Sequence, residues 1–132
     1  MTASLRLFAI VLFIITVLGS GADAKNAKHK DVNPGAFKRQ IAKTQVIIVD
    51  VRTPDEYNAA HMENAKMIDF KDENFKDEIT KLPKDIPLCI YCRSGNRSSK
   101  TMKILKQEGF LKVYNLKGGI NAWQEKGLKT VQ

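Results

Sequence analysis

The sequence lacks the residue clusters that mark the common metal and cofactor sites. Its 132 residues include two cysteines and two histidines, and none of its His, Cys or Asp residues are grouped at metal-ligand spacing. Neither a P-loop nor a dinucleotide-binding loop occurs around its eight glycines. We therefore expect no bound metal and no cofactor.

Long apolar runs are also absent, apart from a short one near the amino terminus. Arg6 precedes residues 7–18, which are apolar except for Thr16, and small residues surround Asp23 at 22–24. This run falls short of the ~20 residues that span a bilayer. The pattern predicts a secretory signal peptide over residues 1–24, cleaved after Ala24, rather than a membrane anchor. We expect a periplasmic or secreted protein without stable membrane insertion after cleavage.

Acidic residues are the minority charge. The chain has 14 Asp and Glu against 22 Lys and Arg, a net charge of +8, and the predicted signal peptide removes one of each, Arg6 and Asp23. A basic balance can indicate nucleic-acid binding. Here the lysines are scattered among acidic residues without interleaved aromatic residues of the stacking kind. We expect no nucleic-acid partner, and a solvated surface that attracts small anions.

Apolar runs alternate with helical patterns along the rest of the chain. Residues 25–30 are polar and lysine-rich and are predicted to form a disordered tail in which His29 has no task. One domain is predicted over residues 31–132. Strands that alternate with helices predict an α/β fold with a central, mostly parallel sheet and helices on both faces.

The individual elements follow from local patterns. Continuous apolar runs predict buried strands at residues 46–51, 88–91 and 113–116. Helices are predicted from Asn33-Pro34, from a capping box at residues 53–56, along the stripe of Phe75, Ile79 and Leu82, after residue 98 or 99, and over residues 120–126.

The chemistry is concentrated where a cysteine leads a short loop of small and cationic residues, namely Cys92, Arg93, Ser94, Gly95, Asn96, Arg97 and Ser98. The loop follows a predicted strand, at the carboxyl end where open α/β sheets bind ligands. Ser98 or Ser99 is predicted to cap the next helix. Backbone N–H groups turned inward, together with the positive end of that helix, would form a cradle for an anion.

The same cradle is expected to activate the cysteine. Gly95 and Asn96 tolerate the positive φ angles that such a loop needs. Its field, reinforced by Arg93 and Arg97, is expected to lower the pKa of Cys92, so that more of it is the nucleophilic thiolate. The alternative is an inert core cysteine, but such a residue has no use for two neighbouring arginines.

Cys89 and Cys92 also form a C-x-x-C pattern, which is typical of redox pairs. In a strand, residues three apart lie roughly 10 Å apart with side chains on opposite faces, whereas a disulfide needs Cα atoms within about 7 Å. We therefore predict that Cys89 is a core residue.

Two further motifs flank the cysteine loop. Residues 48–57 (IVDVRTPDEY), followed by His61, and residues 117–123 (KGGINAW) lie on either side of it. In this order the three motifs resemble those of the rhodanese family, the thiosulfate-type sulfurtransferases. The resemblance implies that Cys92 carries a persulfide and that residues 93–97 surround its sulfur. One departure is that the histidine is followed by residues 62–65 (MENA), where the family usually has a hydrophobe, Pro, Gly and Ala.

Three polar residues in the first motif are interpreted as structural. Asp50 and Arg52, at the end of a buried strand, are predicted to form an internal ion pair that positions loops. His61 is predicted to cap backbone groups rather than to act as a base. The resemblance supports both interpretations.

We therefore expect a monomeric sulfurtransferase that moves sulfane sulfur from thiosulfate, or a similar small anionic donor, to cyanide or a thiol through a Cys92 persulfide. An alternative is a carrier that hands its persulfide to a protein partner. A cysteine-based phosphatase or arsenate reductase is less favoured, because such enzymes place five residues between cysteine and arginine, and only four separate Cys92 from Arg97.

Overall fold

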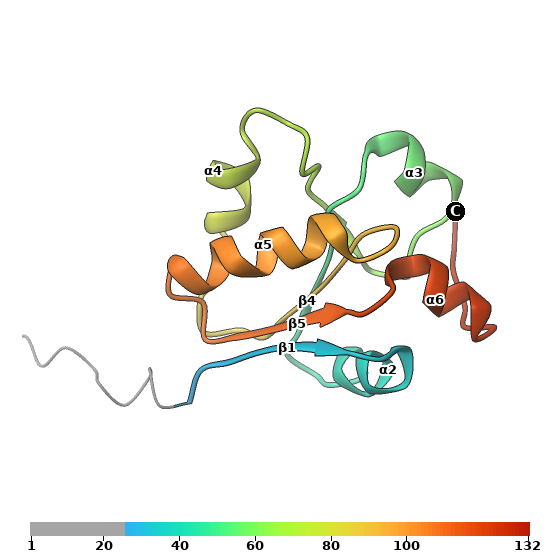
Figure 1. Cartoon of the computed structure of the whole chain (residues 1–132), viewed down its shortest axis with the longest axis horizontal. Helices are drawn as coiled ribbons and strands as arrows, with labels where there is room; N and C mark the ends of the chain where they lie inside the picture. Colours follow the sequence, from blue (N-terminus) through green and yellow to red (C-terminus); the bar gives the residue numbers. More distant parts are fainter. Residues whose placement is uncertain (1–25) are drawn as a thin grey trace, which may run out of the picture.

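The structure is a computed structural model that describes residues 26–132, so the predicted signal peptide lies outside the described residues. Strands and helices alternate along most of the chain (Figure 1). The elements are β1 (Lys28–Val32), α2 (Pro34–Ile41), β2 (Ile47–Asp50), α3 (Pro54–Ala59), β3 (Lys66–Met67), α4 (Phe75–Thr80), β4 (Leu88–Tyr91), α5 (Asn96–Gln107), β5 (Lys112–Leu116) and α6 (Gly119–Glu125).

The strands form one five-stranded sheet in the order β1-β5-β4-β2-β3, and every pair is parallel. The predicted parallel α/β architecture is thus confirmed. β4 is the middle strand, with β2 on one side and β5 on the other. All four of its residues are buried, because a central parallel strand is covered on both faces. The cysteine loop starts where this strand ends.

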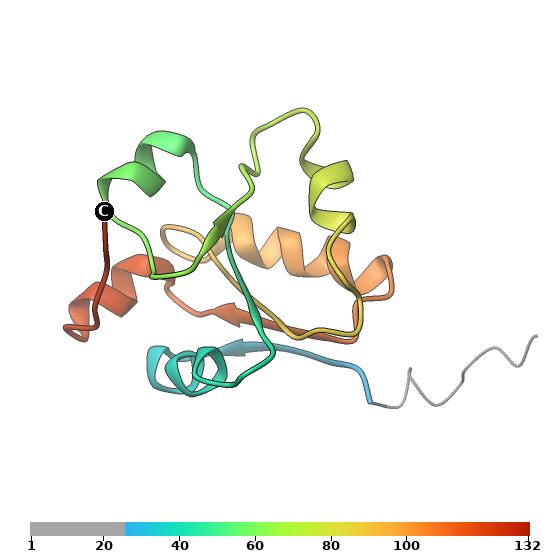
Figure 2. The ribbon, with the colours of Figure 1, turned by 180° about the vertical axis from the view of Figure 1, so that it is seen from behind.

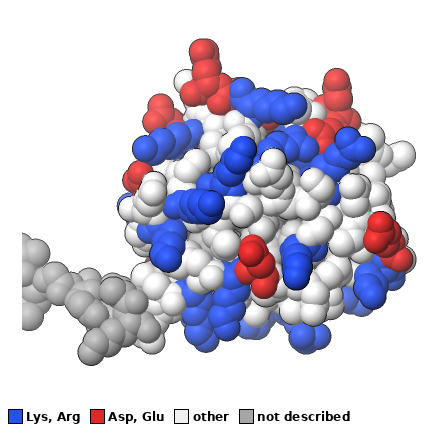
Figure 3. Space-filling view, viewed as in Figure 1, with Lys and Arg blue, Asp and Glu red and all other residues white. Residues whose placement is uncertain are grey.

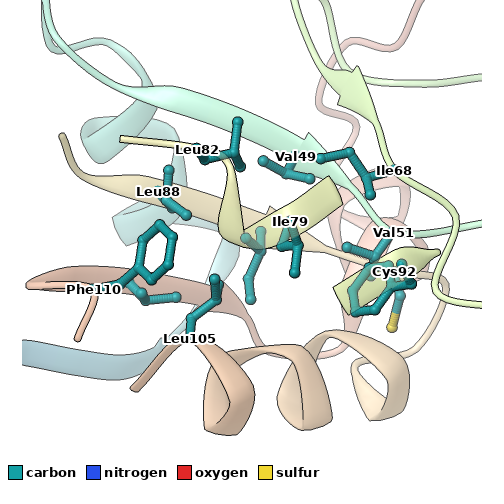
Figure 4. Close-up of a cluster of buried hydrophobic side chains, with 12 residues drawn as sticks. Val49, Val51, Ile68, Ile79, Leu82, Leu88, Cys92, Leu105 and Phe110 are labelled. Atoms are coloured by element: carbon teal, nitrogen blue, oxygen red, sulfur yellow. The ribbon is translucent and has the colours of Figure 1, made fainter. Parts of the chain in front are cut away.

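Helices cover both faces of the sheet, as predicted. One core cluster joins the sheet to α4 and α5 through residues such as Ile79, Leu88 and Leu105 (Figure 4). The other joins it to α2 and α6, where Phe37 meets the rings of Tyr91 and Trp123 edge to face. Successive residues of β4 belong to different clusters, which is the period-two alternation of a strand.

The amino-terminal boundary differs from the prediction. Residues 28–30 are not a disordered tail but belong to β1, which pairs with β5 and extends the sheet at one edge (Figure 2). His29 has a structural task, since its Nε2 lies 2.7 Å from the backbone oxygen of Phe110. The lysine-rich composition is compatible with a strand because edge strands tolerate exposed charged side chains, and Lys28 and Lys30 are both exposed.

Basic side chains predominate over the middle of the face shown in Figure 3, and most of its acidic side chains lie nearer the edge. Within residues 26–132, the helices are all too short or too polar to cross a membrane.

Asp50 and Arg52 form the buried ion pair that the sequence predicted. Arg52 Nη2 lies 2.7 Å from Asp50 Oδ2, and the Arg52 Nε donates to both carboxylate oxygens. The same Nη2 donates to the backbone oxygen of Ala60 at 2.6 Å. The pair therefore ties the end of β2 to the residue that follows α3.

His61 is structural as well. Its Nδ1 lies 2.9 Å from the backbone oxygen of Tyr57, and its ring stacks on the Tyr57 ring with centroids 3.7 Å apart. Its backbone forms an antiparallel bridge with Val131. These contacts hold the carboxyl-terminal segment against the turn after α3.

Replacing Asp50 with Asn should destabilise the fold strongly, because it leaves the Arg52 guanidinium buried without a counter-charge. We expect the free energy of unfolding in urea to fall by about 3–5 kcal/mol. Asp85→Asn, at an exposed loop position, is the matched control and should change it by less than about 0.5 kcal/mol. Equal small losses in both variants would show that the pair does not hold the fold.

Candidate active site

Cys92 lies directly after β4, with its side chain at one end of the core cluster formed under α4 and α5. Figure 4 shows its sulfur next to α5. The residue is 1% exposed, and burial alone would favour the neutral thiol. The surrounding hydrogen bonds therefore decide whether the sulfur is reactive.

Two donors bond to the sulfur. The backbone N–H of Gly95 donates to Cys92 Sγ at 3.1 Å, and the Ser98 hydroxyl donates to it at 3.3 Å. Burial raises the pKa of Cys92, but hydrogen bonds from the Ser98 side chain and from the backbones of Ser98, Gly95 and Ser94 outweigh it, so the pKa is lowered. The predicted activation of the thiol is present, and its main cause is hydrogen bonding rather than the arginines.

Ser98 does not cap α5 as predicted. The helix begins at Asn96, and the residue at its N-cap is Gly95, with φ of +107° and no side-chain cap. Ser98 lies buried in the first turn, where its hydroxyl is within hydrogen-bonding distance of both Gly95 O and Cys92 Sγ. A left-handed glycine turns the chain tightly into the helix, and this brings Ser98 under the sulfur.

The first turn of α6 fixes the other side of the loop. The backbone N–H groups of Ile120 and Asn121 donate to the carbonyl oxygens of Cys92 and Arg93 at 2.9 and 3.1 Å. Gly119 makes this approach possible, because a Cβ at that position would overlap the carbonyl group of Arg93. These two bonds hold the start of the loop against α6, and two residues further on the N–H of Gly95 donates to the sulfur.

Arg97 is held by a partner that the sequence analysis missed. Its Nη1 and Nη2 donate to the two carboxylate oxygens of Glu56 at 2.8 and 2.9 Å. Glu56 also accepts a hydrogen bond from the Thr53 hydroxyl at 3.1 Å, as a variant of the predicted capping box. The pair links α3 to the first turn of α5 and leaves Arg97 with its charge largely balanced. A pairing over 41 positions leaves no local sequence signal.

The remaining loop residues lie at the surface. Arg93, Ser94 and Asn96 are exposed, and Arg93 forms no ion pair among residues 26–132. Of the predicted loop residues, the structure thus places Ser94, Gly95 and Ser98 as hydrogen-bonding neighbours of the sulfur, whereas Arg97 is bound to Glu56 and Arg93 and Asn96 lie at the surface.

Cys89 is separate from this site. It is fully buried in the cluster between the sheet and α2, whereas Cys92 belongs to the cluster on the opposite face, and both are free thiols. Burial raises the pKa of Cys89 to about 12. The predicted core role is confirmed, and this geometry does not suit a redox pair. Among the described residues, no three His, Cys, Asp or Glu side chains are grouped as metal ligands.

Comparison with known proteins agrees with this geometry. The sequence profile of the rhodanese-like domain matches residues 33–126. A sulfurtransferase from Allochromatium vinosum is 34% identical over 102 residues, which cover 76% of this chain and 94% of that protein. A tRNA uridine(34) hydroxylase from Pelagibacter ubique is 30% identical over 109 residues, and the match covers 80% of this chain but only 36% of the hydroxylase.

The fold has close counterparts among solved structures. A rhodanese-related protein from Thermoplasma volcanium superposes with a TM-score of 0.69 at 26% identity, covering 77% of this chain and 97% of the other. The near-complete coverage of a sulfurtransferase supports sulfur transfer as the class of activity. With its three motifs, its parallel sheet and its profile match over residues 33–126, this chain belongs to the rhodanese-like domain family.

Proposed function

We propose that the protein transfers sulfane sulfur from thiosulfate, or a similar small anionic donor, to cyanide or a thiol through a persulfide on Cys92. The observation that carries the proposal is the environment of the Cys92 sulfur. It is buried, its pKa is lowered, and it accepts hydrogen bonds from the Gly95 N–H and the Ser98 hydroxyl. Such a site stabilises an anionic sulfur and keeps bulk water away from it.

The first half-reaction forms the persulfide. The Cys92 thiolate attacks the outer sulfur of thiosulfate, a new sulfur–sulfur bond forms, and the old one breaks. Its electron pair leaves with sulfite. The negative charge then rests on the outer sulfur of the enzyme persulfide, and N–H groups of the loop stabilise it in this proposal.

Arg93 is the residue that we assign to donor binding. It is exposed at the start of the loop, and its charge is not balanced by an ion pair in the described part of the chain. A guanidinium can hold two oxygens of a dianion at once. Arg97 acts differently in this proposal. Its ion pair with Glu56 fixes the first turn of α5, on which Ser98 lies.

The second half-reaction regenerates the thiolate. Cyanide attacks the outer sulfur of the persulfide and leaves as thiocyanate, while the bonding electron pair returns to Cys92 Sγ. A thiolate reacts in the same way and leaves as a persulfide. Neither step needs a cofactor, and because the second half-reaction returns Cys92 from persulfide to thiolate, the complete cycle needs no external oxidant or reductant.

A cysteine-based phosphatase is disfavoured by the state of Arg97. In such enzymes the arginine after the loop must be free to bind the phosphoryl oxygens in a bidentate manner. Here both of its terminal nitrogens are already bound to Glu56. The loop is also one residue shorter between cysteine and arginine than phosphatases require.

Cys92→Ser should abolish sulfur uptake. Intact mass measurement of the unreduced protein should show a gain of about 32 Da after thiosulfate, which cyanide then removes, because an activated thiolate forms the covalent intermediate. Cys89→Ala is the control and should keep the gain, since Cys89 lies on the other face of the sheet. A gain that persists in Cys92→Ser would contradict the proposed nucleophile.

Ser98→Ala should raise the pKa of Cys92, because it removes the hydroxyl that donates to Sγ. In the unaltered protein the rate of alkylation by iodoacetamide should reach half its maximum below the ordinary cysteine pKa of about 8.5. The variant should shift this midpoint upward and slow alkylation at neutral pH at least about threefold. Ser99→Ala, one position along α5, should leave the profile unchanged. Coincident profiles for all three proteins would refute a role for the hydroxyl.

Glu56→Gln should lower stability in a pH-dependent way. The hydrogen bond from Arg97 holds the pKa of Glu56 at about 2, below its ordinary value of about 4.3. The stabilising free energy of the charged pair is therefore present in full above the ordinary pKa of Glu56, and it is lost as the pH falls through about 2. Both side chains are partly exposed, so we expect about 1 kcal/mol at neutral pH.

The measurement is the free energy of unfolding of Glu56→Gln and of the unaltered protein at several pH values. Their difference should shrink between pH 4.5 and about 2. Glu63→Gln, at an exposed position, should show no such change. A difference that is independent of pH would show that the charge on Glu56 does not matter.

A further inference from the structure

We propose that a depression beside the cysteine loop is an acceptor subsite, which selects thiols that carry carboxylate and amide groups. This inference rests on the proposed function and names the acceptor of its second half-reaction. The depression has a volume of about 260 Å³ and lies between α3, α6 and the loop. Its lining residues are Arg52, Glu56, Ala59, Ala60, Arg93, Ile120, Asn121 and Gln124.

The depression is joined directly to the catalytic loop. Arg93, which contributes to its wall, is the neighbour of Cys92 in the sequence. The backbone N–H of Asn121 donates to the Arg93 carbonyl at 3.1 Å, and that of Ile120 donates to the Cys92 carbonyl at 2.9 Å. A molecule bound there therefore lies against the part of α6 that positions the loop.

Two of the three charged side chains in the wall are already bound in ion pairs, and the third is not. Arg52 is bound to Asp50, and Glu56 is bound to Arg97. Arg93 is exposed and takes part in none of the ion pairs found within residues 26–132. It is therefore the cation of this wall that is available to a ligand, and it would attract a carboxylate.

Two amide side chains stand beside this cation. Asn121 and Gln124 are both exposed, and their side chains have no hydrogen-bond partner in the described part of the chain. They are three positions apart on α6, so they lie on one face of the helix. Side-chain amides can donate to and accept from the amide groups of a peptide.

The remaining wall is apolar and suits the methylene groups of a ligand. Ala59, Ala60 and Ile120 contribute short aliphatic surface. The volume is slightly below the roughly 300–1,000 Å³ of clefts that hold drug-sized ligands. Together these features fit a thiol about the size of a di- or tripeptide, with a carboxylate for Arg93 and amides for the two side chains of α6.

Sulfur transfer from the Cys92 persulfide to a thiol bound in this subsite needs no further reactant. The bound thiol loses its proton to water, and its thiolate attacks the outer sulfur of the Cys92 persulfide. A new sulfur–sulfur bond forms on the acceptor while the bond to Cys92 breaks. The electron pair of the broken bond restores the Cys92 thiolate, and the acceptor leaves as a persulfide anion.

The test compares acceptors that can and cannot use the amides. Glutathione carries carboxylates and amides, whereas 2-mercaptoethanol carries neither, and each is used with thiosulfate as donor. In the double variant Asn121→Ala with Gln124→Ala, we expect the KM for glutathione to rise roughly tenfold, from the loss of two hydrogen bonds. The efficiency with 2-mercaptoethanol should change by less than about twofold.

The matched control is Glu125→Ala, which removes an exposed side chain of α6 that does not line the depression. It should leave the KM for glutathione unchanged. Intact mass after thiosulfate is measured for every protein, because an equal gain of one sulfur shows that the first half-reaction and the fold are preserved.

The outcomes separate the two proposals. A rise in the glutathione KM that is confined to the double variant supports the subsite. An unchanged KM, or an equal loss with both thiols, overturns it while leaving the persulfide mechanism intact. Glutathione turnover that does not saturate in the unaltered protein also overturns it and points to a protein thiol as acceptor. No gain of sulfur in the unaltered protein refutes the proposed function itself.

Discussion

The site depends on the contact between the start of α6 and the loop that follows β4. Two N–H groups of α6 bind the carbonyls of Cys92 and Arg93, and Gly119 is needed because any side chain there would collide with the loop. This contact turns the loop so that the Gly95 N–H faces the sulfur. The carboxy-terminal motif therefore acts through the cysteine loop, although it contributes no side chain to the sulfur.

Hydrogen bonds and charges have separate tasks around Cys92. The lowered pKa comes from the Ser98 hydroxyl and from loop N–H groups, which overcome the cost of burying the sulfur. Two of the three nearby arginines are committed to carboxylates, Arg52 to Asp50 and Arg97 to Glu56. These pairs fix the ends of β2, α3 and α5. Arg93 forms no ion pair within residues 26–132. In the proposed function, donor binding and thiol activation would therefore rest on different residues.

Much of this arrangement could be predicted from the sequence, because its signals are local. The apolar run of β4 and the caps at Asn33 and Thr53 all formed as their patterns indicate. The features that the sequence did not predict depend on contacts between segments that are distant in the sequence or on the backbone conformation of one glycine. β1 is polar and is recognisable as a strand only through its pairing with β5. Ser98 looks like a cap, but the left-handed Gly95 takes that position and places Ser98 under the sulfur. The Glu56 to Arg97 pair joins distant segments, which a single sequence does not reveal.

The central claim is that the cradle around Cys92 holds an outer sulfur. The most direct measurement is a crystal structure of the protein after exposure to thiosulfate, with the sulfur atoms located by anomalous scattering. The account predicts a second sulfur bonded to Cys92 Sγ and within hydrogen-bonding distance of the loop N–H groups. An unmodified Cys92 in crystals that contain thiosulfate, or a second sulfur bonded to Cys89 instead, would contradict it.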